Sequence, residues 1–464
     1  MAHDGAIVNR VAPVLDRAAT AGCPLGPASH PSREENDVDR TTERRTTGEG
    51  CPVARLGRLR EEGPVVPFDD TPMGPAMLVT RHDDVHAALL DPRLRSDPAA
   101  VPGAGRGIAG VFATLGFPDE LAHLGRGLLV RDGEDHTRLR RLVSRAFTVR
   151  RVRELRPRIE ALTDGLLDDI AAAGADGTPV DLVAALCHPL PIAVICELVG
   201  VPEESREVWR ALARLLVAPD PARMPAAAHA VHDQVHELIA ARRADPADDL
   251  VSALVAVHDD GDRLDSDELA VLLFDLVLAG FETTAHVLSR AALVLLTRPE
   301  QLAVLRDEPE RWPVAVHEIV RTCGAVPMST PRFAAADLDI GGTTVPAGST
   351  VVAGLVTANF DPRRHDRPEE FDVTRDPGRG EGHLGFGQGA HYCLGAALAR
   401  TELEIGLRAL VTRFPALRLA EVVEGPADLG FVRADAVEVR VDALPAHHHS
   451  AGMGGVGQDV RCDP

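Results

Sequence analysis

The chain has 464 residues, of which 45% are hydrophobic, and a formal net charge of -21 at pH 7. This hydrophobic content is enough for a large core, and the acidic balance argues against general nucleic-acid binding, which requires basic surface. Aromatic residues are scarce at 3%. Packing must therefore depend on Leu, Val and Ala, and we expect a mainly α protein with a small β-rich part.

The start of the chain and its apolar segments bear on where the protein works. No charged segment followed by an apolar run opens the sequence, so we expect a cytoplasmic protein. The longest apolar stretch, 269–281, contains Asp275 and is shorter than the roughly 18 residues that suggest a membrane span, so we expect no membrane anchor. The seven cysteines are scattered, a spacing typical neither of a disulfide framework nor of a metal cluster.

The N-terminal part begins with a segment that lacks a periodic apolar face. Residues 1–50 are rich in Pro, Gly, Arg, Glu and Thr, and we expect them to be disordered. A helix, two strands and a second helix are then predicted at 53–60, 65–68, 76–80 and 83–90. Residues 93–127 follow as a long glycine-rich connection, a kind of loop that is usually functional or disordered.

Residues 132–147 predict an arginine-rich helix that opens with acidic residues. His136 and Arg140 are four positions apart and therefore share a face of this helix. Between positions 138 and 158 nine arginines accompany a single acid, Glu154, in an otherwise acidic chain. Such a local charge reversal is typical of a docking patch for an acidic partner, and a solvated basic face is the alternative.

A long helix is predicted in the middle of the chain, after helical patterns at 151–243 that prolines interrupt. Asp265 and Glu268 form a capping-box arrangement, and the helix can continue to about Arg298. Residues 269–281 are apolar nearly all round, which predicts a buried helix. Its centre reads AGFETT at 279–284, and polar groups buried there would cost stability unless they served a function.

The C-terminal third combines one more helix with short strands. Glu318 and Arg321 are an i,i+3 pair on a predicted helix at 315–321, which by itself is a commonplace ion pair. Strands are predicted at 332–334, 338–342 and 344–352, and a closing hairpin near 432–439. We expect one folded domain over 51–445, followed by a flexible tail at 446–464.

A glycine-rich loop with one cysteine precedes the last predicted helix. The stretch 385–396 reads GFGQGAHYCLGA, and its glycines describe a tightly bent backbone. Because Cys393 would lie at a helix N-terminus, we expect the helix dipole to lower the pKa of its thiol. A single thiolate fits an axial ligand to haem iron better than a zinc or iron–sulfur site. The alternative is a buried structural cysteine beside a turn.

The spacing Phe386-x-x-Gly389-x-x-x-Cys393-x-Gly395 resembles the haem-ligand signature of the cytochrome P-450 superfamily, the haem-thiolate monooxygenases. The resemblance covers roughly residues 50–445 and implies the cytochrome P-450 fold, with haem b between the central long helix and the cysteine loop. It implies that Phe386 shields the sulfur, that the glycines, Gly389 among them, make room for the porphyrin, and that Cys393 binds the iron.

The resemblance also implies roles for side chains on other elements. Four residues would hold the haem propionates, namely His136, Arg140, Arg332 and His391. Without the cysteine loop, a solvated basic face would be the preferred interpretation of the first two.

Further roles fall on the central helix and on the ion pair that follows it. Gly280 and its alanine neighbour would leave room over the iron, and Glu282 and Thr283 would relay protons. Glu318 and Arg321 would tie the core together. The usual third arginine of that group is absent from its place, and Arg364 or Arg375 could substitute.

The reaction implied is insertion of one oxygen atom from O2 into an apolar organic substrate, with electrons from NAD(P)H through a ferredoxin reductase and a ferredoxin. Residues 93–127 and 208–224 would cover the substrate, and residues 324–331 would line its pocket. Bacterial relatives of this type tailor polyketides, macrolides and other secondary metabolites. Two alternatives remain on the same scaffold: an oxidative coupling or ring-forming enzyme, and a haem-thiolate protein that binds a ligand without turnover.

Overall fold

The structure is a computed structural model that describes residues 52–69, 74–105, 107–114, 116–217, 220, 222–256, 264, 266–378, 380–424 and 434–441. The predictions of a disordered extension at 1–50 and of a flexible tail at 446–464 lie outside the described residues. The described helices are α2 (Pro52–Glu62), α3 (His82–Leu90), α4 (Gly107–Thr114), α5 (Gly133–Ala146), α6 (Val149–Ala173), α7 (Pro189–Val199), α8 (Arg206–Val217), α9 (Met224–Ala244), α10 (Leu250–Ala256), α11 (Ser266–Thr297), α12 (Pro299–Asp307), α13 (Trp312–Cys323), α14 (Leu355–Asn359) and α15 (Ala396–Arg413).

The strands form three small groups. The described strands are β1 (Val65–Phe68), β2 (Ala76–Val79), β3 (Leu94–Arg95), β4 (Val180–Asp181), β5 (Arg332–Ala334), β6 (Leu338–Ile340), β7 (Thr343–Val345), β8 (Thr350–Ala353), β9 (Arg418–Glu424) and β10 (Ala434–Arg440). The largest sheet has the order β1-β2-β8-β5-β3, in which only β2 and β8 run parallel. The other groups are the β4-β10-β9 sheet and the β6-β7 hairpin. The prediction of a mainly α fold with a small β part is confirmed.

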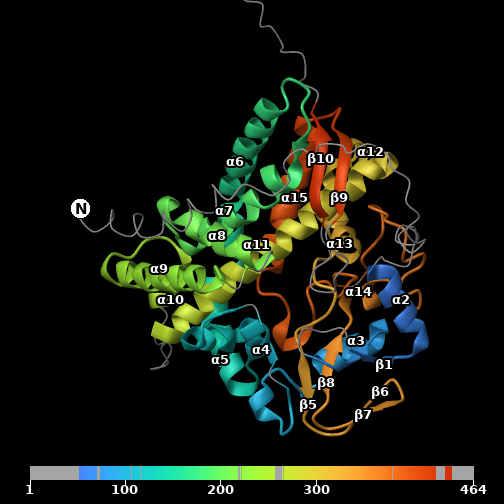
Figure 1. The fold of residues 1–464 in the computed structure, drawn as a ribbon. Helices are drawn as coiled ribbons and strands as arrows, with labels where there is room; N and C mark the ends of the chain where they lie inside the picture. Colours follow the sequence, from blue (N-terminus) through green and yellow to red (C-terminus); the bar gives the residue numbers. More distant parts are fainter. Residues whose placement is uncertain are drawn as a thin grey trace, which may run out of the picture.

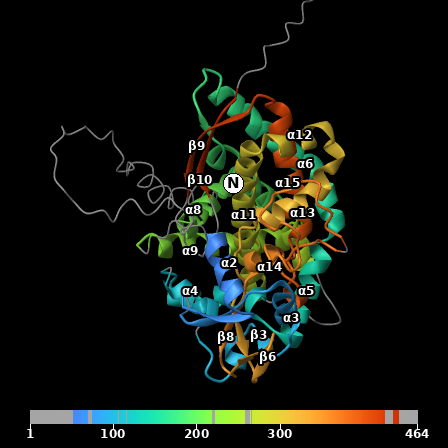
Figure 2. The same cartoon turned by 90° about the vertical axis from the view of Figure 1, so that its right-hand side faces the viewer.

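Helix α11 runs through the middle of the helical part (Figures 1 and 2) and packs against α7, α9, α13 and α15. Its bounds agree with the expected helix, and the turn before Pro299 ends it. It is long and apolar enough to cross a membrane, but 67% of its most apolar window is buried inside the fold. The position of α11 in the core therefore explains why its surface is apolar nearly all round.

The segment 93–127 has more regular structure than its glycines suggest. Besides β3 and α4 it contains the 3-10 turns η1 (Pro98–Ala100) and η2 (Asp119–Arg126). Phe112 and Phe117 stack with their ring centroids 4.6 Å apart, and Phe117 meets Phe274 of α11 edge-on at 6.1 Å. These aromatic contacts hold the segment on the central helix. The long glycine-rich connection expected here therefore contains short helices and a strand, because glycine content gave no information about this packing.

Prolines also end fewer helices than expected. Pro189 and Pro191 lie in the first turn of α7, where the N–H that proline lacks has no partner within the helix. They start a helix instead of interrupting one. Just before them, Cys187 ends the turn η4 (Val183–Cys187) and belongs to the hydrophobic core, and burial raises the pKa of its thiol.

Candidate haem-thiolate site

The cysteine loop is a tight turn between α3 and α15. Gly387 and Gly389 have φ of 69° and 77°, a left-handed conformation that side chains disfavour. The Cys393 N–H donates to Phe386 O at 2.9 Å and closes the loop. A Cβ on Gly389 would lie 3.0 Å from Leu90 Cδ2 of α3. Gly389 therefore serves the close approach of the loop to α3, a packing role that the spacing alone did not indicate.

The Cys393 thiol is in a different electrostatic setting from the one expected. Burial raises the pKa of the thiol, although the Gly395 N–H and the nearby Arg140 and Arg400 act in the opposite direction. Because α15 begins at Ala396, the cysteine precedes the helix instead of sitting in its first turn. The expected lowering of the pKa is therefore wrong. A thiolate is favoured at this position only beside a strong cation such as a bound metal ion.

Phe386 is held in place by its neighbours in the same loop. Its ring lies 5.6 Å from that of His383 and 6.4 Å from that of Tyr392, and the Arg400 guanidinium lies 5.5 Å from its centroid. The Tyr392 hydroxyl donates to Glu381 Oε1 at 2.9 Å, and Glu381 also pairs with Arg400. This network was missed from the sequence because the three partners are up to 19 positions apart.

Four cationic or ionisable side chains meet beside the cysteine loop. His136 and Arg140 come from α5, Arg332 from β5, and His391 from the 3-10 turn η7 (Gly389–His391). The rings of His136 and His391 have centroids 4.2 Å apart. Ser96 Oγ accepts from Arg332 Nη1 at 2.5 Å and lies 3.2 Å from His391 Nε2. The structure thus brings together the four residues that the resemblance assigned to the propionates.

The cluster has more donors than acceptors. Arg332 Nε and His136 Nε2 are buried without a hydrogen-bond partner among the described residues. Burial lowers the pKa of Arg332 and of Arg140, and burial followed by the nearby His391 lowers that of His136 to about 4. Asp132, near His391, is already engaged by the backbone N–H groups of residues 96 and 97. Orphaned buried donors of this kind fit the carboxylates of a bound group.

Arg140 connects this cluster to the cysteine loop. Its Nη2 donates to Tyr392 O at 2.6 Å, one residue before Cys393. The sulfur and the four side chains therefore lie on adjoining parts of the protein, although α5 and the loop are about 250 residues apart in sequence.

The middle of α11 has an accessible face inside an otherwise buried helix. Ala279 is exposed and Thr283 is half-buried, and the Thr283 hydroxyl donates to Ala279 O at 3.0 Å. Gly280 points elsewhere, because a Cβ on it would lie 3.0 Å from Ile195 Cδ1 of α7. The residue of the small pair that occupies the accessible face is thus Ala279, whereas Gly280 allows α7 to approach.

Glu282 has a partner that the sequence reasoning overlooked. Its side chain is buried, and Oε1 lies 2.7 Å from Nε2 of His286, one turn later on α11. The His286 ring in turn meets His188 edge-on at 5.9 Å. The Glu-x-x-x-His spacing was the available signal, since residues four apart share a helix face. Thr284 donates to Gly280 O and faces away from this pair.

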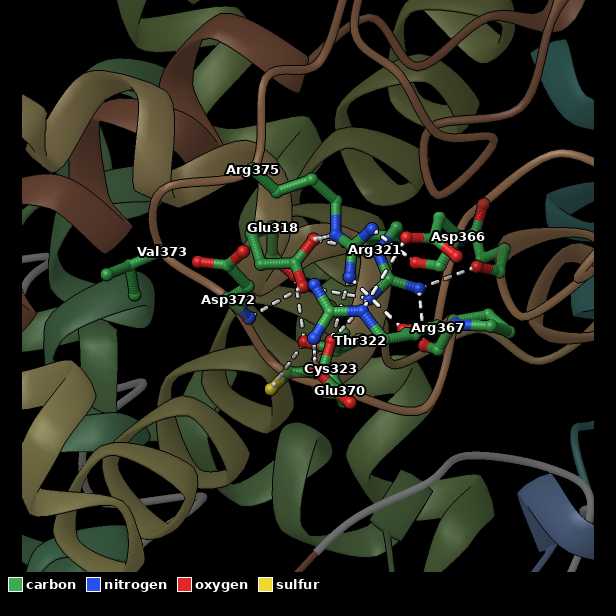
Figure 3. A network of polar contacts seen from close by, with 12 residues as sticks. Glu318, Arg321, Thr322, Cys323, Asp366, Arg367, Glu370, Asp372, Val373 and Arg375 are labelled. Carbon is green, nitrogen blue, oxygen red and sulfur yellow. Dashed lines mark hydrogen bonds and ion pairs between the residues drawn. The ribbon is translucent and has the colours of Figure 1, made fainter.

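Glu318 and Arg321 form a buried pair with two hydrogen bonds (Figure 3). Arg321 Nε and Nη2 donate to the two Glu318 oxygens at 2.7 and 2.8 Å, and both side chains are 2% exposed. Arg321 Nη1 also donates to Asn359 O and Pro368 O, each at 2.8 Å. The Glu318–Arg321 pair is therefore buried and is not a commonplace surface pair. It joins α13 to the segment before the cysteine loop.

The third member of this group is Arg375. Its Nε lies 3.2 Å from Glu318 Oε2, and its Nη1 donates to Asp366 O at 2.8 Å. Arg364, the other candidate, lines a polar cavity next to the pair. Figure 3 shows the Arg375 side chain next to the Glu318 carboxylate.

These features define a haem-binding protein with a cysteine ligand, and comparison with known proteins agrees. The family model described as Cytochrome P450 matches residues 206–312 and 313–428. The chain is 44% identical over 367 residues to 6-deoxyerythronolide B hydroxylase of Saccharopolyspora erythraea, covering 78% of this chain and 88% of the relative. It is 41% identical to the monooxygenase PikC of Streptomyces venezuelae, covering 79% and 85%.

Solved structures of the same kind share the fold. The polyketide synthase cytochrome P450 PksS of Bacillus subtilis 168 has a TM-score of 0.75 at 33% identity, covering 85% of this chain and 97% of that one. A variant of the mixed-function P450 MycG in complex with mycinamicin IV has a TM-score of 0.73 at 36% identity, covering 83% and 95%.

This chain belongs to the cytochrome P450 family. It is a haem-dependent monooxygenase, and members of the family carry haem b with a cysteine thiolate as axial ligand. The expected fold, enzyme class and cofactor are therefore confirmed.

Proposed function

We propose that Cys393 is the thiolate ligand of haem b and that this enzyme inserts one oxygen atom from O2 into a polyketide or macrolide type of secondary metabolite. The observation that carries the proposal is the contact between Arg140 and Tyr392 O, because it sets a cluster of Arg and His side chains, with two buried nitrogens that lack a partner, beside the cysteine loop. Product mass tests it, since a gain of one oxygen is expected, whereas a loss of hydrogens would indicate oxidative coupling.

The residues around the cysteine fit the two ends of the cofactor. Arg140, Arg332, His136 and His391 would hold the propionates, because the buried guanidinium group of Arg332 and the half-buried one of Arg140 compensate the burial of carboxylates. Phe386, packed against Tyr392, would cover the sulfur. When bound through a thiolate, haem supplies the activation of O2, which electron donation from the sulfur favours.

The accessible face of α11 would supply the protons. Thr283 places a hydroxyl on that face through its bond to Ala279 O. Glu282, buried one position away, has Oε1 2.7 Å from His286 Nε2, but its two oxygens make no hydrogen bond among the described residues and would be available to relay a proton. A buried carboxylate beside an imidazole holds a proton close to a hydroxyl without admitting bulk water.

Replacing the hydroxyl tests this relay. Thr283→Ala should leave the haem spectrum unchanged, while the yield of product per NAD(P)H consumed falls about tenfold or more, because proton delivery contributes at least that factor. Thr297→Ala is the matched control, since Thr297 makes the same bond to the residue four earlier at the far end of α11. Coupling that is unchanged in Thr283→Ala would remove Thr283 from the relay.

The substrate class rests on what similar enzymes are named for. Relatives include hydroxylases of 6-deoxyerythronolide B and a hydroxylase/epoxidase of mycinamicin IV. Titration of such compounds into the holoprotein, followed by the shift of the haem absorption band, identifies the ligands that enter the pocket.

We also propose a cytoplasmic setting, in which NAD(P)H, a ferredoxin reductase and a ferredoxin supply the electrons.

The surface around α5 and α6 supports an acidic electron donor. Its nine arginines are less uniform than the sequence suggested, because acids of α6 itself and of distant elements neutralise several of them. These ion pairs include Arg138–Glu268, Arg150–Glu154, Arg151–Asp248, Arg156–Glu404 and Arg158–Glu197. Arg153 of α6 is exposed and is suited to steer an acidic partner, and the exposed Arg145 of α5 adds positive charge to the same surface.

Charge reversal tests the docking surface. Arg145→Glu combined with Arg153→Glu should raise the KM for a ferredoxin about tenfold at low salt, because steering by surface charge changes the rate of encounter. The difference from the unmodified protein should shrink as ionic strength rises. Arg58→Glu on α2, which both views place away from α5, is the control. An equal KM for the double variant and the control would exclude this surface.

A further inference from the structure

A polar cavity lies beside the buried Glu318–Arg321 pair. Its volume is about 160 Å³, roughly ten times the space that one water molecule needs. Its wall is formed by α13, by the turn at 364–365 that follows α14, and by the stretches 375–378 and 381–382 that precede the cysteine loop. The described lining residues belong neither to the propionate cluster nor to 385–396. The cavity is therefore separate from the residues that would hold the haem.

The acids in the wall of this cavity are already engaged. Glu318 is held by two arginines (Figure 3). Glu381 pairs with Arg400. The third acid, Asp376, is exposed, and its Oδ1 accepts from the Gly378 N–H at 2.8 Å. Each described acid of the wall thus has a partner before any ligand enters.

The basic groups of the wall are less well satisfied. Arg364 is exposed and makes no ion pair with another described residue. His365 Nε2 and His317 Nδ1 are buried without a hydrogen-bond partner among the described residues, and His365 as a whole is 8% exposed. A neutral imidazole can donate from one of its two ring nitrogens. Both rings can therefore offer a hydrogen to an oxygen of a ligand.

The charges around His365 favour an anion. Burial lowers the pKa of His365 to about 4, and the neighbouring Arg321, His82, Arg364 and Arg375 act in the same direction. Groups that disfavour an imidazolium at this place stabilise a negative charge there. Because an arginine stays protonated at all ordinary pH values, this preference for an anion holds at neutral pH.

We propose that this cavity binds a small oxyanion, and that inorganic phosphate is the ligand that fits it. Oxygens of the ion would accept from the Arg364 guanidinium and from the rings of His365 and His317. A phosphate offers several acceptor oxygens to donors from different segments, and a guanidinium can bind two of them at once. The bound ion would join α13 to the turn at 364–365. Because it binds the folded state alone, it would stabilise the fold next to the cysteine loop.

Titration calorimetry of phosphate into the full-length holoprotein tests the site. At an ionic strength held constant with sodium chloride, we expect one phosphate per chain with a dissociation constant on the order of 1 mM, since a few charge-assisted hydrogen bonds must offset the immobilisation of the ion. In about 50 mM phosphate the midpoint of thermal unfolding should rise by about 2 °C relative to chloride. Far-ultraviolet circular dichroism measures this shift.

Substitutions at neighbouring positions locate the bound ion. Arg364→Gln should weaken phosphate binding about tenfold or more, the usual effect of losing a hydrogen bond from a charged donor. His317→Leu, on another segment, should weaken it about threefold. Arg363→Gln is the matched control, because it removes the same charge one position away from a side chain that pairs with Glu61 and does not line the cavity. We expect its affinity for phosphate to stay within about twofold of the unmodified protein.

Three results would overturn the inference: no saturable binding of phosphate up to about 50 mM, the same thermal shift in chloride as in phosphate, or equal affinities for Arg364→Gln and Arg363→Gln. The first result would mean that the cavity holds water alone, and the last that the ion binds elsewhere on the surface. Arg364 is exposed, so its substitution leaves the core intact and the comparison remains valid. Because phosphate binding is measured without turnover, the outcome is independent of the proposed function.

Discussion

Cys393→Ala should yield a folded protein whose reduced, carbon-monoxide-treated form lacks the absorption band of thiolate ligation, and product formation should fall below detection. We expect this because of where the cysteine lies. The bond from its N–H to Phe386 O holds Cys393 in the loop, and the thiol lies beside Arg140. The other described cysteines, Cys187, Cys196 and Cys323, are buried in the helical core, where burial raises the pKa of each thiol.

Cys323→Ala is the matched control for this prediction. Cys323 is fully buried at the end of α13, so the substitution tests the loss of a thiol without touching the loop. We expect its absorption band to be unchanged. A normal band in Cys393→Ala would show that another sulfur binds the iron and would refute the assignment of the site.

Arg321→Ala should lower the free energy of unfolding by about 3–5 kcal/mol, the usual result of removing one partner of a buried ion pair. The substitution leaves the buried Glu318 carboxylate with Arg375 as its remaining charged partner. It also removes the donor to the carbonyls of Asn359 and Pro368. Urea titration followed by far-ultraviolet circular dichroism measures the loss, and the yield of haem-loaded protein should fall with it.

The chain contains a suitable control for that experiment. Arg311 and Glu308 are also an i,i+3 pair, but their side chains are 37% and 46% exposed. Arg311→Ala should change the free energy of unfolding by less than about 1 kcal/mol, as solvent-exposed pairs do. Similar losses for Arg311→Ala and Arg321→Ala would contradict the structural role given to the buried pair.

Short-range patterns were sufficient for most of the secondary structure. The bounds of α11 follow from an acidic start, a continuous apolar surface and Pro299 after its end, all of which are signals within one or two turns. The four strands β1, β2, β5 and β8 were likewise expected from their β-branched and aromatic residues. The segment 93–127 was missed because its elements are stabilised by Phe274 on α11.

The sequence by itself determined the family, the cysteine loop and the residue types of the site, because their spacing is a local property of the chain. Only the tertiary structure decided that Arg375 joins Glu318, that Ala279 and not Gly280 lies on the accessible face of α11, and that burial raises the pKa of Cys393. The physical reason is that partners and burial are set by segments far apart in sequence, and these meet only when the helices pack. The hydrogen bond between Leu128 and Asp275 is another example, since it joins residues that are 147 positions apart in sequence.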